Sequence, residues 1–176
     1  MAGPYTNMKF MPTGGINAKN LNDYLSFDRI IACGGSWMVD PKLVAAGEFD
    51  KITEMTKEAV TQMLGFELAH VGINAETEAA ASEIAAAFDG AFNTGVKVGN
   101  SSIFAGLGVE VMKTPYLGAK GHIAYKTNYI ERAVAYLKAK GIEINEESAK
   151  YNAKGKLTAV YLKEEFGGFA IHLLQK

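Results

Sequence analysis

Four side chains of this 176-residue chain have the types and spacing of a metal site. The chain has three histidines, His70, His122 and His172, and each falls in a segment with the pattern of a β-strand. Glu110, in the segment "GVEVMK", occupies a fourth such strand. Three imidazoles and one carboxylate suit a borderline divalent ion such as Zn, Ni, Co, Mn or Fe(II). We therefore take these four residues as candidate metal ligands.

The periodicity of a strand places each candidate ligand opposite apolar residues. Because side chains alternate along a strand, Val71 and Ile73 point one way and His70 points the other. The same alternation separates the other three candidates from their apolar neighbours. The apolar residues can pack under a helix, so we expect the candidates on the opposite side, where two curved sheets could form a cleft.

A second interpretation of the same faces requires no metal. A single histidine on a strand is most often a half-buried, hydrogen-bonded residue or a surface residue. The faces that carry the candidates also carry the apolar side chains of Leu68, Met112, Ala124 and Leu174. These could line an apolar ligand cleft, and the metal content of the protein would separate the two interpretations.

The strands that hold the candidates belong to an order of elements that occurs twice. Aligning His70 with His122 places strand on strand and helix on helix, and such a repeat must be recognised before a fold is proposed. The first copy has predicted strands over 66–74, 92–98, 101–106 and 109–113, and a helix over 76–88. The second copy has predicted strands over 121–128, 143–151, 157–163 and 169–174, and a helix over 129–141.

The first sixty residues follow a different pattern. Residues 9–11 and 30–33 predict short strands, the second without polar alternation, as expected for a strand buried on both faces of a parallel sheet. Asn17 is a good N-cap for a helix over 18–25. Asp40 followed by a proline predicts the start of a second helix, and helical spacing of apolar residues predicts a third over 49–60.

The segment from 66 to 176 resembles a vicinal oxygen chelate domain, of the glyoxalase and bleomycin-resistance superfamily. The resemblance rests on the strand motifs "HVGIN", "GHIAYKTN" and "GFAIHLLQ". It implies an α+β fold of paired βαβββ modules around a cleft, where a divalent metal polarises the oxygens of a chelating substrate and stabilises an enediolate. By position, the ligands implied are His70, Glu110, His122 and His172.

One position departs from the pattern of glyoxalase-like members. The last strand of those proteins commonly offers a glutamate, which can also serve as the base. Here the same place holds His172. The departure is compatible with metal binding and argues against a glyoxalase-type proton transfer.

The first segment resembles the class I 2-keto-3-deoxy-6-phosphogluconate aldolases, the KHG/KDPG aldolases. "KFMPTGGIN" and "IIACGGSWMV" are similar to the last two strands of that barrel. A TIM barrel binds phosphate in the loops after these strands, and glycines let backbone N–H groups approach the anion. The alternative is that both loops are tight turns after buried strands. The resemblance implies a phosphate cradle of Thr13, Gly14, Gly15, Gly35 and Ser36.

The two resemblances imply two parts. Residues 1–62 would be the C-terminal strands and helices of an incomplete TIM barrel, a βαβα remnant, and residues 63–176 the vicinal oxygen chelate domain. The family's Schiff-base lysine and acid–base carboxylate would lie upstream, so we expect this chain to be part of a longer lyase and inactive by itself as an aldolase. Because strands cut from a barrel leave unpaired edges, we expect the first segment to be the less stable part.

Composition and the absence of motifs narrow the partners. The formal net charge of −1 gives no electrostatic reason to expect nucleic acid or an anionic membrane. No GxGxxG or Walker pattern is present, so we expect no nucleotide cofactor. The single cysteine, Cys33, allows no intrachain disulfide. No signal peptide or long apolar run is visible, and we therefore expect a cytoplasmic location. We also expect a homo-oligomer that takes a small phosphorylated or oxygenated substrate.

Three hypotheses on function follow from these observations. The first is the C-terminal part of a KDPG-type aldolase, whose longer form would release pyruvate and an aldehyde phosphate. The second is a metal-dependent, glyoxalase-like enzyme acting on a small oxygenated substrate. The third is a non-catalytic module that binds a small ligand or dimerises. Bound metal separates the second hypothesis from the third, and aldolase activity of the purified chain would contradict the first as stated.

Overall fold

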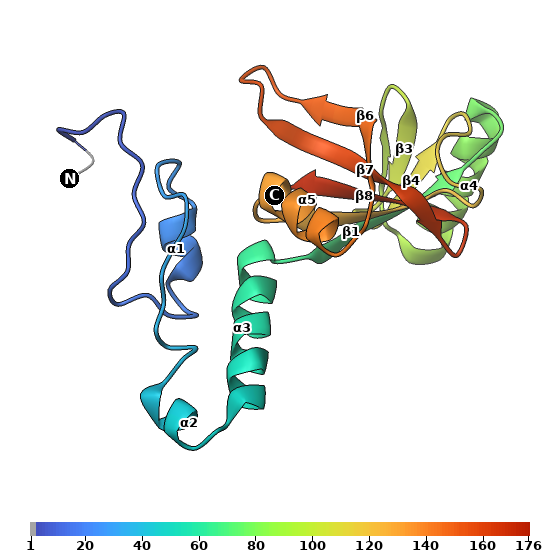
Figure 1. Ribbon diagram of the computed structural model, residues 1–176. Helices are drawn as coiled ribbons and strands as arrows, with labels where there is room; N and C mark the ends of the chain where they lie inside the picture. Colours follow the sequence, from blue (N-terminus) through green and yellow to red (C-terminus); the bar gives the residue numbers. More distant parts are fainter. Residues whose placement is uncertain (1–2) are drawn as a thin grey trace. The chain divides into compact units, whose positions relative to one another are not determined.

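The computed structural model describes residues 3–176, and the chain divides into two units, Met1–Met63 and Leu64–Lys176 (Figure 1). In the described part of the first unit the helices are α1 (Leu21–Leu25), α2 (Pro41–Ala45) and α3 (Phe49–Leu64), whose last residue belongs to the second unit. No helix of the described residues is long and apolar enough to cross a lipid bilayer.

The start of α2 is confirmed, and the start of α1 is not. The Asp40 carboxylate accepts a hydrogen bond from the backbone N–H of Lys42 at 2.8 Å, as an N-cap should. Asn17 was expected to cap a helix over 18–25, but α1 begins only at Leu21. The Asn17 side chain instead accepts from the backbone N–H of Lys19, and the backbone N–H of Asn17 donates to the Asn20 side chain, so the chain makes a turn before the helix.

The two strands predicted in the first unit are reduced to one parallel bridge. Phe10 pairs with Ile30, through hydrogen bonds from the Phe10 N–H to Arg29 and from the Ile31 N–H to Phe10. The prediction of strands over 9–11 and 30–33 was therefore wrong in extent, although the parallel pairing is present. A parallel ladder is stable inside a sheet covered on both faces, and the described part of this unit has no further strand to extend it.

The second unit is an eight-stranded sheet with the order β2-β3-β4-β1-β5-β8-β7-β6. Each half is a strand, a helix and three strands, which confirms the predicted α+β fold of paired βαβββ modules. The first module has β1 (Glu67–Asn74), α4 (Glu78–Phe92), β2 (Val96–Val98), β3 (Ser102–Ala105) and β4 (Val109–Met112). The second has β5 (His122–Thr127), α5 (Ile130–Ala139), β6 (Ile144–Tyr151), β7 (Leu157–Phe166) and β8 (Phe169–Gln175).

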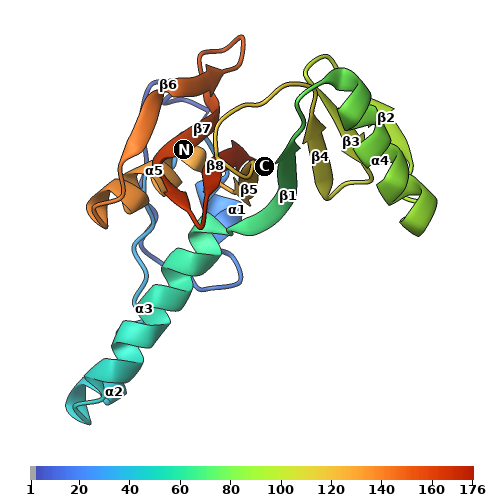
Figure 2. The same ribbon diagram turned by 90° about the vertical axis from the view of Figure 1, so that its right-hand side faces the viewer.

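The modules are joined through their first strands. β1 pairs antiparallel with β5 at the centre of the sheet, while each first strand pairs parallel with the last strand of its own module, β4 or β8. Each module's helix packs on strands of that module, α4 on β3 and β4 and α5 on β7 and β8 (Figure 2). The four central strands, β4, β1, β5 and β8, are therefore the first and last strands of each module.

The core under α4 shows why the alanine-rich segment forms this helix. Small side chains at one face of α4 bring it close to the sheet, and the Thr77 side chain caps it by accepting from the N–H of Ala80. Asn93 ends it in a left-handed conformation with φ 51°. The predicted strand over 92–98 therefore starts later, at Val96. The buried residues of this core are Ala75, Ala81, Ala85, Ile103, Ala105 and Val111.

Candidate metal centre

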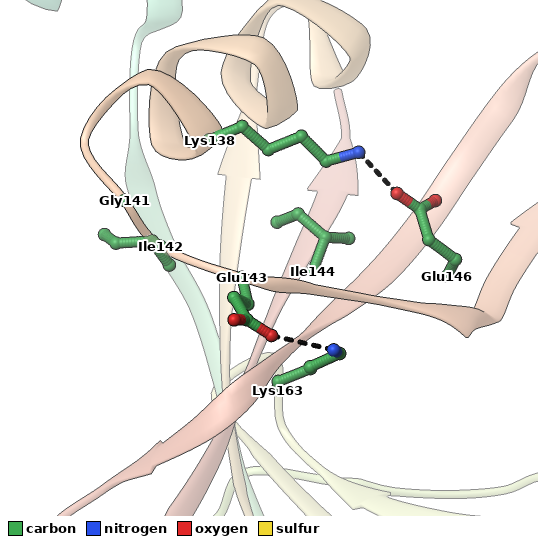
Figure 3. Close-up of a pocket in the computed structure, with 7 residues that line it drawn as sticks. All are labelled: Lys138, Gly141, Ile142, Glu143, Ile144, Glu146 and Lys163. Carbon is green, nitrogen blue, oxygen red and sulfur yellow. Dashed lines mark hydrogen bonds and ion pairs between the residues drawn. The ribbon is translucent and has the colours of Figure 1, made fainter.

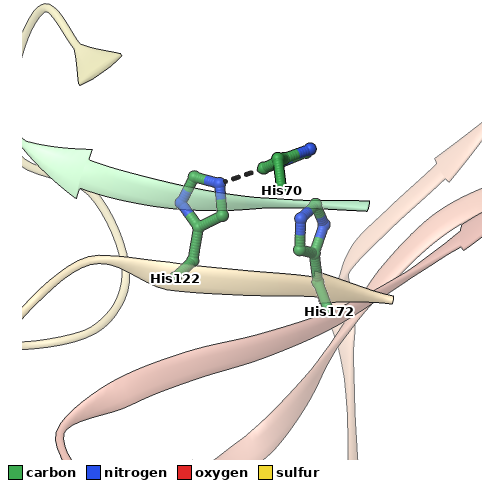
Figure 4. A group of neighbouring side chains, drawn as sticks. All are labelled: His70, His122 and His172. Carbon is green, nitrogen blue, oxygen red and sulfur yellow. Dashed lines mark hydrogen bonds between the residues drawn. The ribbon is translucent and has the colours of Figure 1, made fainter. Parts of the chain in front are cut away.

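Each of the four central strands contributes one candidate ligand. β4 provides Glu110, β1 provides His70, β5 provides His122 and β8 provides His172. Figure 4 shows the three imidazole rings gathered on one side of the sheet. One potential ligand atom from each of the three rings lies within 4.8 Å of the others. The structure therefore brings together all four residues that the sequence singled out.

The register of the sheet explains how three rings fit in this space. Across the strands, Gly72 stands between Glu110 and His122. In the next row, Ala124 stands between His70 and His172. Ligands and small residues thus alternate across the four central strands, and each ring has a small residue as a neighbour in the register.

Gly72 is required by the position of the His122 ring. A Cβ built at Gly72 would lie 2.0 Å from Cε1 of His122 and 2.3 Å from both ring nitrogens. His122 is 1% exposed, so its ring is surrounded by protein and cannot turn out into solvent at this place. The motif "HVGIN" contained this glycine, but only the pairing of Gly72 with His122 shows what it does.

Three ligand atoms form a close triangle. Nε2 of His70 lies 3.1 Å from Nε2 of His122 and 3.0 Å from Oε2 of Glu110, and the His122–Glu110 distance is 3.1 Å. A neutral imidazole carries at most one proton on Nε2, and an ionised carboxylate carries none. Two protons cannot make hydrogen bonds of all three contacts. At least one contact of the triangle is therefore not a hydrogen bond, and it brings together two N–H donors or two acceptor atoms.

The fourth candidate has no hydrogen-bond partner. His172 is 7% exposed, and neither of its ring nitrogens has a partner among residues 3–176. Nδ1 of His122 is also buried without a partner in the described chain. The His172 ring is stacked on Tyr161, with centroids 4.5 Å apart and 13° between the planes. The ring is therefore held by stacking, while its nitrogens stay available as ligands.

The electrostatics of the cluster favour a cation. Burial raises the pKa of Glu110, but hydrogen bonds from His122, His70 and Ser102 outweigh burial and leave that pKa far below its usual range. Glu110 is therefore an anion in a buried site. Burial, followed by the charges of His122 and His70, lowers the pKa of His172 to about 3, so this ring is neutral. A neutral imidazole is the form that binds metal.

The donor set fits a divalent ion. Ligand atoms that share one ion at about 2.0–2.2 Å lie roughly 2.8–3.6 Å apart, for angles from about 90° to tetrahedral. The three distances of the triangle, 3.0 to 3.1 Å, lie within this range. Buried imidazoles with unpartnered nitrogens and one ionised carboxylate are the ligands that Zn, Ni, Co, Mn and Fe(II) accept.

Sequence reasoning missed two side chains beside the ligands. Ser102 of β3 donates a hydrogen bond from Oγ to Oε1 of Glu110 at 2.6 Å. Tyr161 of β7 stands next to His172 in the strand register and stacks on it. No local pattern marks either residue, because both reach the site only through pairing with β4 or β8. Of the residues proposed for an apolar cleft, Leu68 is exposed and Ala124 is fully buried.

The predicted phosphate residues lie on two loops of the first unit that touch each other. The Gly34 N–H donates to the Pro12 carbonyl at 2.9 Å, and a Cβ at Gly34 would lie 3.2 Å from Cγ2 of Thr13. Gly15 has φ 71°, a conformation that favours glycine. These contacts bring the loop with Thr13, Gly14 and Gly15 next to the loop with Gly35 and Ser36.

A surface depression of about 290 Å³ lies elsewhere on the second unit, on the side of α5 and β6 (Figure 3). Two ion pairs, Lys138 with Glu146 and Lys163 with Glu143, lie across its lining. None of the candidate ligands lines it. The depression is therefore separate from the imidazole cluster.

Comparisons with known proteins divide along the chain. The family model for KDPG and KHG aldolase matches residues 1–55. A 2-dehydro-3-deoxy-phosphogluconate aldolase of Treponema pallidum is 45% identical over 65 residues, which are 37% of this chain and 30% of that protein. The KHG/KDPG aldolase of Escherichia coli K12 is 43% identical over 60 residues, 34% of this chain and 28% of that protein. The chain thus spans under a third of the length of these relatives.

Solved structures match a larger share of the chain at low identity. A hypothetical protein of Bacillus halodurans is 14% identical and covers 64% of this chain and 95% of its own, with a TM-score of 0.45. Methylmalonyl-CoA epimerase of Mycobacterium tuberculosis is 13% identical and covers 64% of this chain and 89% of its own, with a TM-score of 0.44.

Proposed function

We propose that the second unit binds one divalent transition metal through His70, Glu110, His122 and His172 and acts there on a small substrate with neighbouring oxygen atoms. The observation that carries the proposal is the triangle of three potential ligand atoms, 3.0 to 3.1 Å apart, in which at most two of the three contacts can be hydrogen bonds. The unpartnered nitrogens of His172 beside it supply a fourth ligand.

The residues of the site have separate tasks. The bound ion would supply Lewis-acid chemistry, polarising substrate oxygens. Glu110 places a negative charge in the site, and this charge favours the binding of a cation there. Burial, then the charges of Tyr116 and Glu110, raises the pKa of Tyr161, so its hydroxyl keeps its proton and can donate to a substrate oxygen. His172 takes the place where glyoxalase-like proteins commonly have a glutamate, so proton removal would need another group.

The test is metal content by mass spectrometry of untagged protein after reconstitution with Zn, Ni, Co, Mn or Fe(II). We expect about one equivalent per chain in the wild type and none in His122→Ala. Tyr125→Phe, a change on the opposite face of the same strand, is the control and should keep the metal. Absence of every one of these metals from the reconstituted wild type would overturn the proposal and favour a non-catalytic ligand-binding or dimerisation module.

A second function is proposed for the first unit, which carries the aldolase likeness. We propose that its loops with Thr13, Gly14, Gly15, Gly35 and Ser36 bind the phosphate of a phosphorylated substrate in a longer aldolase, and that these 176 residues alone do not cleave it. The support is the family match over residues 1–55 and the contact between the two loops.

The measurement for this second proposal is pyruvate release from 2-keto-3-deoxy-6-phosphogluconate, coupled to lactate dehydrogenase. We expect no release by the chain alone. Inorganic phosphate should shift the backbone amide signals of Gly14, Gly15 and Gly35, and should leave Gly90 of α4 unchanged. Pyruvate release, or equal shifts at all four glycines, would contradict the proposal.

A further inference from the structure

The two oxygens of Glu110 have different neighbours. Oε2 faces the Nε2 atoms of His70 and His122, at 3.0 and 3.1 Å. Oε1 accepts the hydrogen bond from the Ser102 hydroxyl at 2.6 Å. Ser102 is only 6% exposed and belongs to β3, the neighbour of β4 on the side away from the imidazoles. The carboxylate is therefore held between a hydroxyl on one side and the ligand cluster on the other.

The direction of this hydrogen bond is fixed by chemistry. An ionised carboxylate can only accept, so the hydroxyl donates and its proton points at Oε1. Bonds of a hydroxyl to a charged oxygen are short and strong, and the distance of 2.6 Å agrees. While this bond exists, one lone pair of Oε1 is used and the carboxylate cannot turn to present both oxygens to the imidazoles.

We propose that Ser102 is a positioning residue which holds Oε1 and makes Glu110 a ligand through Oε2 alone. The inference rests on the proposed metal site. Partners of this kind orient ligands, and their loss typically lowers metal affinity about 10- to 100-fold. With one oxygen from Glu110 and one nitrogen from each histidine, four positions of the ion are filled. In a six-coordinate ion, two positions are then free for two substrate oxygens.

In the described part of the chain, the candidate ligands His122 and His172 lack such a partner. His172 is held by stacking on Tyr161, and Nδ1 of His122 has no partner in the described chain. Among the hydrogen bonds of the described residues, the Ser102 hydroxyl is the one that donates to a candidate ligand. Its removal should free the carboxylate to bind with both oxygens.

The experiment compares Co(II) binding by the full chain of the wild type, Ser102→Ala and Ser102→Thr, with affinity from competition against a chelator and coordination from the visible absorption spectrum. We expect Ser102→Ala to bind about 10- to 100-fold more weakly, with a changed visible absorption band because the second oxygen of Glu110 joins the coordination of the ion. Ser102→Thr keeps the hydroxyl and should restore both. Thr127→Val removes another buried hydroxyl, bonded to the Leu64 carbonyl, and should change neither.

A double-mutant comparison shows whether Ser102 acts through Glu110. In a Glu110→Gln background, the further change Ser102→Ala should cost less than twofold in affinity. An equal loss in both backgrounds, or a Ser102→Ala protein with wild-type affinity and spectrum, would overturn the inference while leaving the metal site intact. Absence of Co(II) binding by the wild type would instead overturn the proposed function itself.

If Ser102→Ala does not fold, the wild type still decides the matter. The infrared difference between the Co(II)-loaded wild type and Glu110→Gln isolates the two carboxylate stretching bands of Glu110. A wide separation of the bands, as for binding through one oxygen, supports the inference. A narrow separation, as for binding through both oxygens, contradicts it.

Discussion

The first unit has a close likeness to known sequences and little internal structure, whereas the second has a complete sheet and a candidate site. Among residues 3–63, the buried apolar side chains are Ile16, Leu21, Leu25 and Ala59, and the strand pairing is the bridge between Phe10 and Ile30. In the second unit, eight strands form a continuous ladder, and both modules bury apolar side chains against a helix.

This difference shows that sequence likeness and local order are separate properties. The first unit has motifs similar to those of KDPG and KHG aldolases, and two of its glycine-containing loops touch, but a parallel strand needs neighbours that the described part of this unit does not contain. The second unit obtains those neighbours by repetition, because the antiparallel pairing of β1 with β5 joins one module to the other. The predictions below test this contrast.

The largest effect is expected from separating the two units. Residues 64–176 alone should unfold in one cooperative transition, within about 4 °C of the main transition of the full chain, and bind metal equally well. Residues 1–63 alone should show no cooperative transition, because so small a buried core cannot offset chain entropy. Calorimetry and circular dichroism of both pieces provide the measurement. A cooperative transition of 1–63 would remove the contrast between the units.

The next largest effect is expected from Gly72→Ala. The added methyl group would occupy the space of the buried His122 ring, so the ring must leave its place and the affinity for Zn or Co(II) should fall about 100-fold or more. Gly90→Ala is the matched control, because a Cβ there meets nothing within 4 Å and lies in helix α4, where alanine is favoured over glycine. Equal affinity of the two variants would show that Gly72 does not position His122.

The fold of the second unit was predictable because its pattern occurs twice. Two copies of strand, helix and three strands gave the order of elements, and errors remained only at their ends. The helix predicted over 76–88 is α4, Glu78–Phe92, because Thr77 caps it and Asn93 ends it. The prediction of strands over 9–11 and 30–33 failed for a different reason. A strand buried on both faces needs covering helices and neighbouring strands, and a local apolar run does not show whether these are present.

The candidate ligands were predictable from alternation, and the residues that support them were not. His70 and His122 stood out because they occupy equivalent places on repeated strands. Gly72, Ser102 and Tyr161 acquire their roles only from pairing between strands, which the spacing of residues along one strand does not reveal.

A smaller effect is expected on the pH dependence of stability of the second unit, which contains His172. The folded pKa of His172 is depressed to about 3, so between pH 6.5 and pH 3 the unfolded chain binds a proton that the folded, metal-free protein does not. Stability is therefore highest above the unfolded pKa and declines as pH falls, by about 2 kcal/mol between pH 7 and pH 5. His172→Phe keeps a ring beside Tyr161 and should remove most of this decline. The measurement is urea unfolding of both proteins at pH 7 and pH 5. An equal loss of unfolding free energy in the two proteins would contradict the assignment to His172.

The smallest effect compares two helix caps of the same kind, one in each unit. Thr77 accepts from the N–H of Ala80 at the start of α4, and Asp40 accepts from the N–H of Lys42 at the start of α2. Replacing a cap by alanine costs about 1 kcal/mol where the helix belongs to a cooperative fold. Thr77→Ala should therefore lower the unfolding free energy of the main transition by about 1 kcal/mol. Asp40→Ala should leave that transition unchanged and reduce only the helical signal, because α2 belongs to the unit for which we expect no cooperative unfolding. If Asp40→Ala lowers the unfolding free energy of the main transition as much as Thr77→Ala does, the two units unfold together as one cooperative structure.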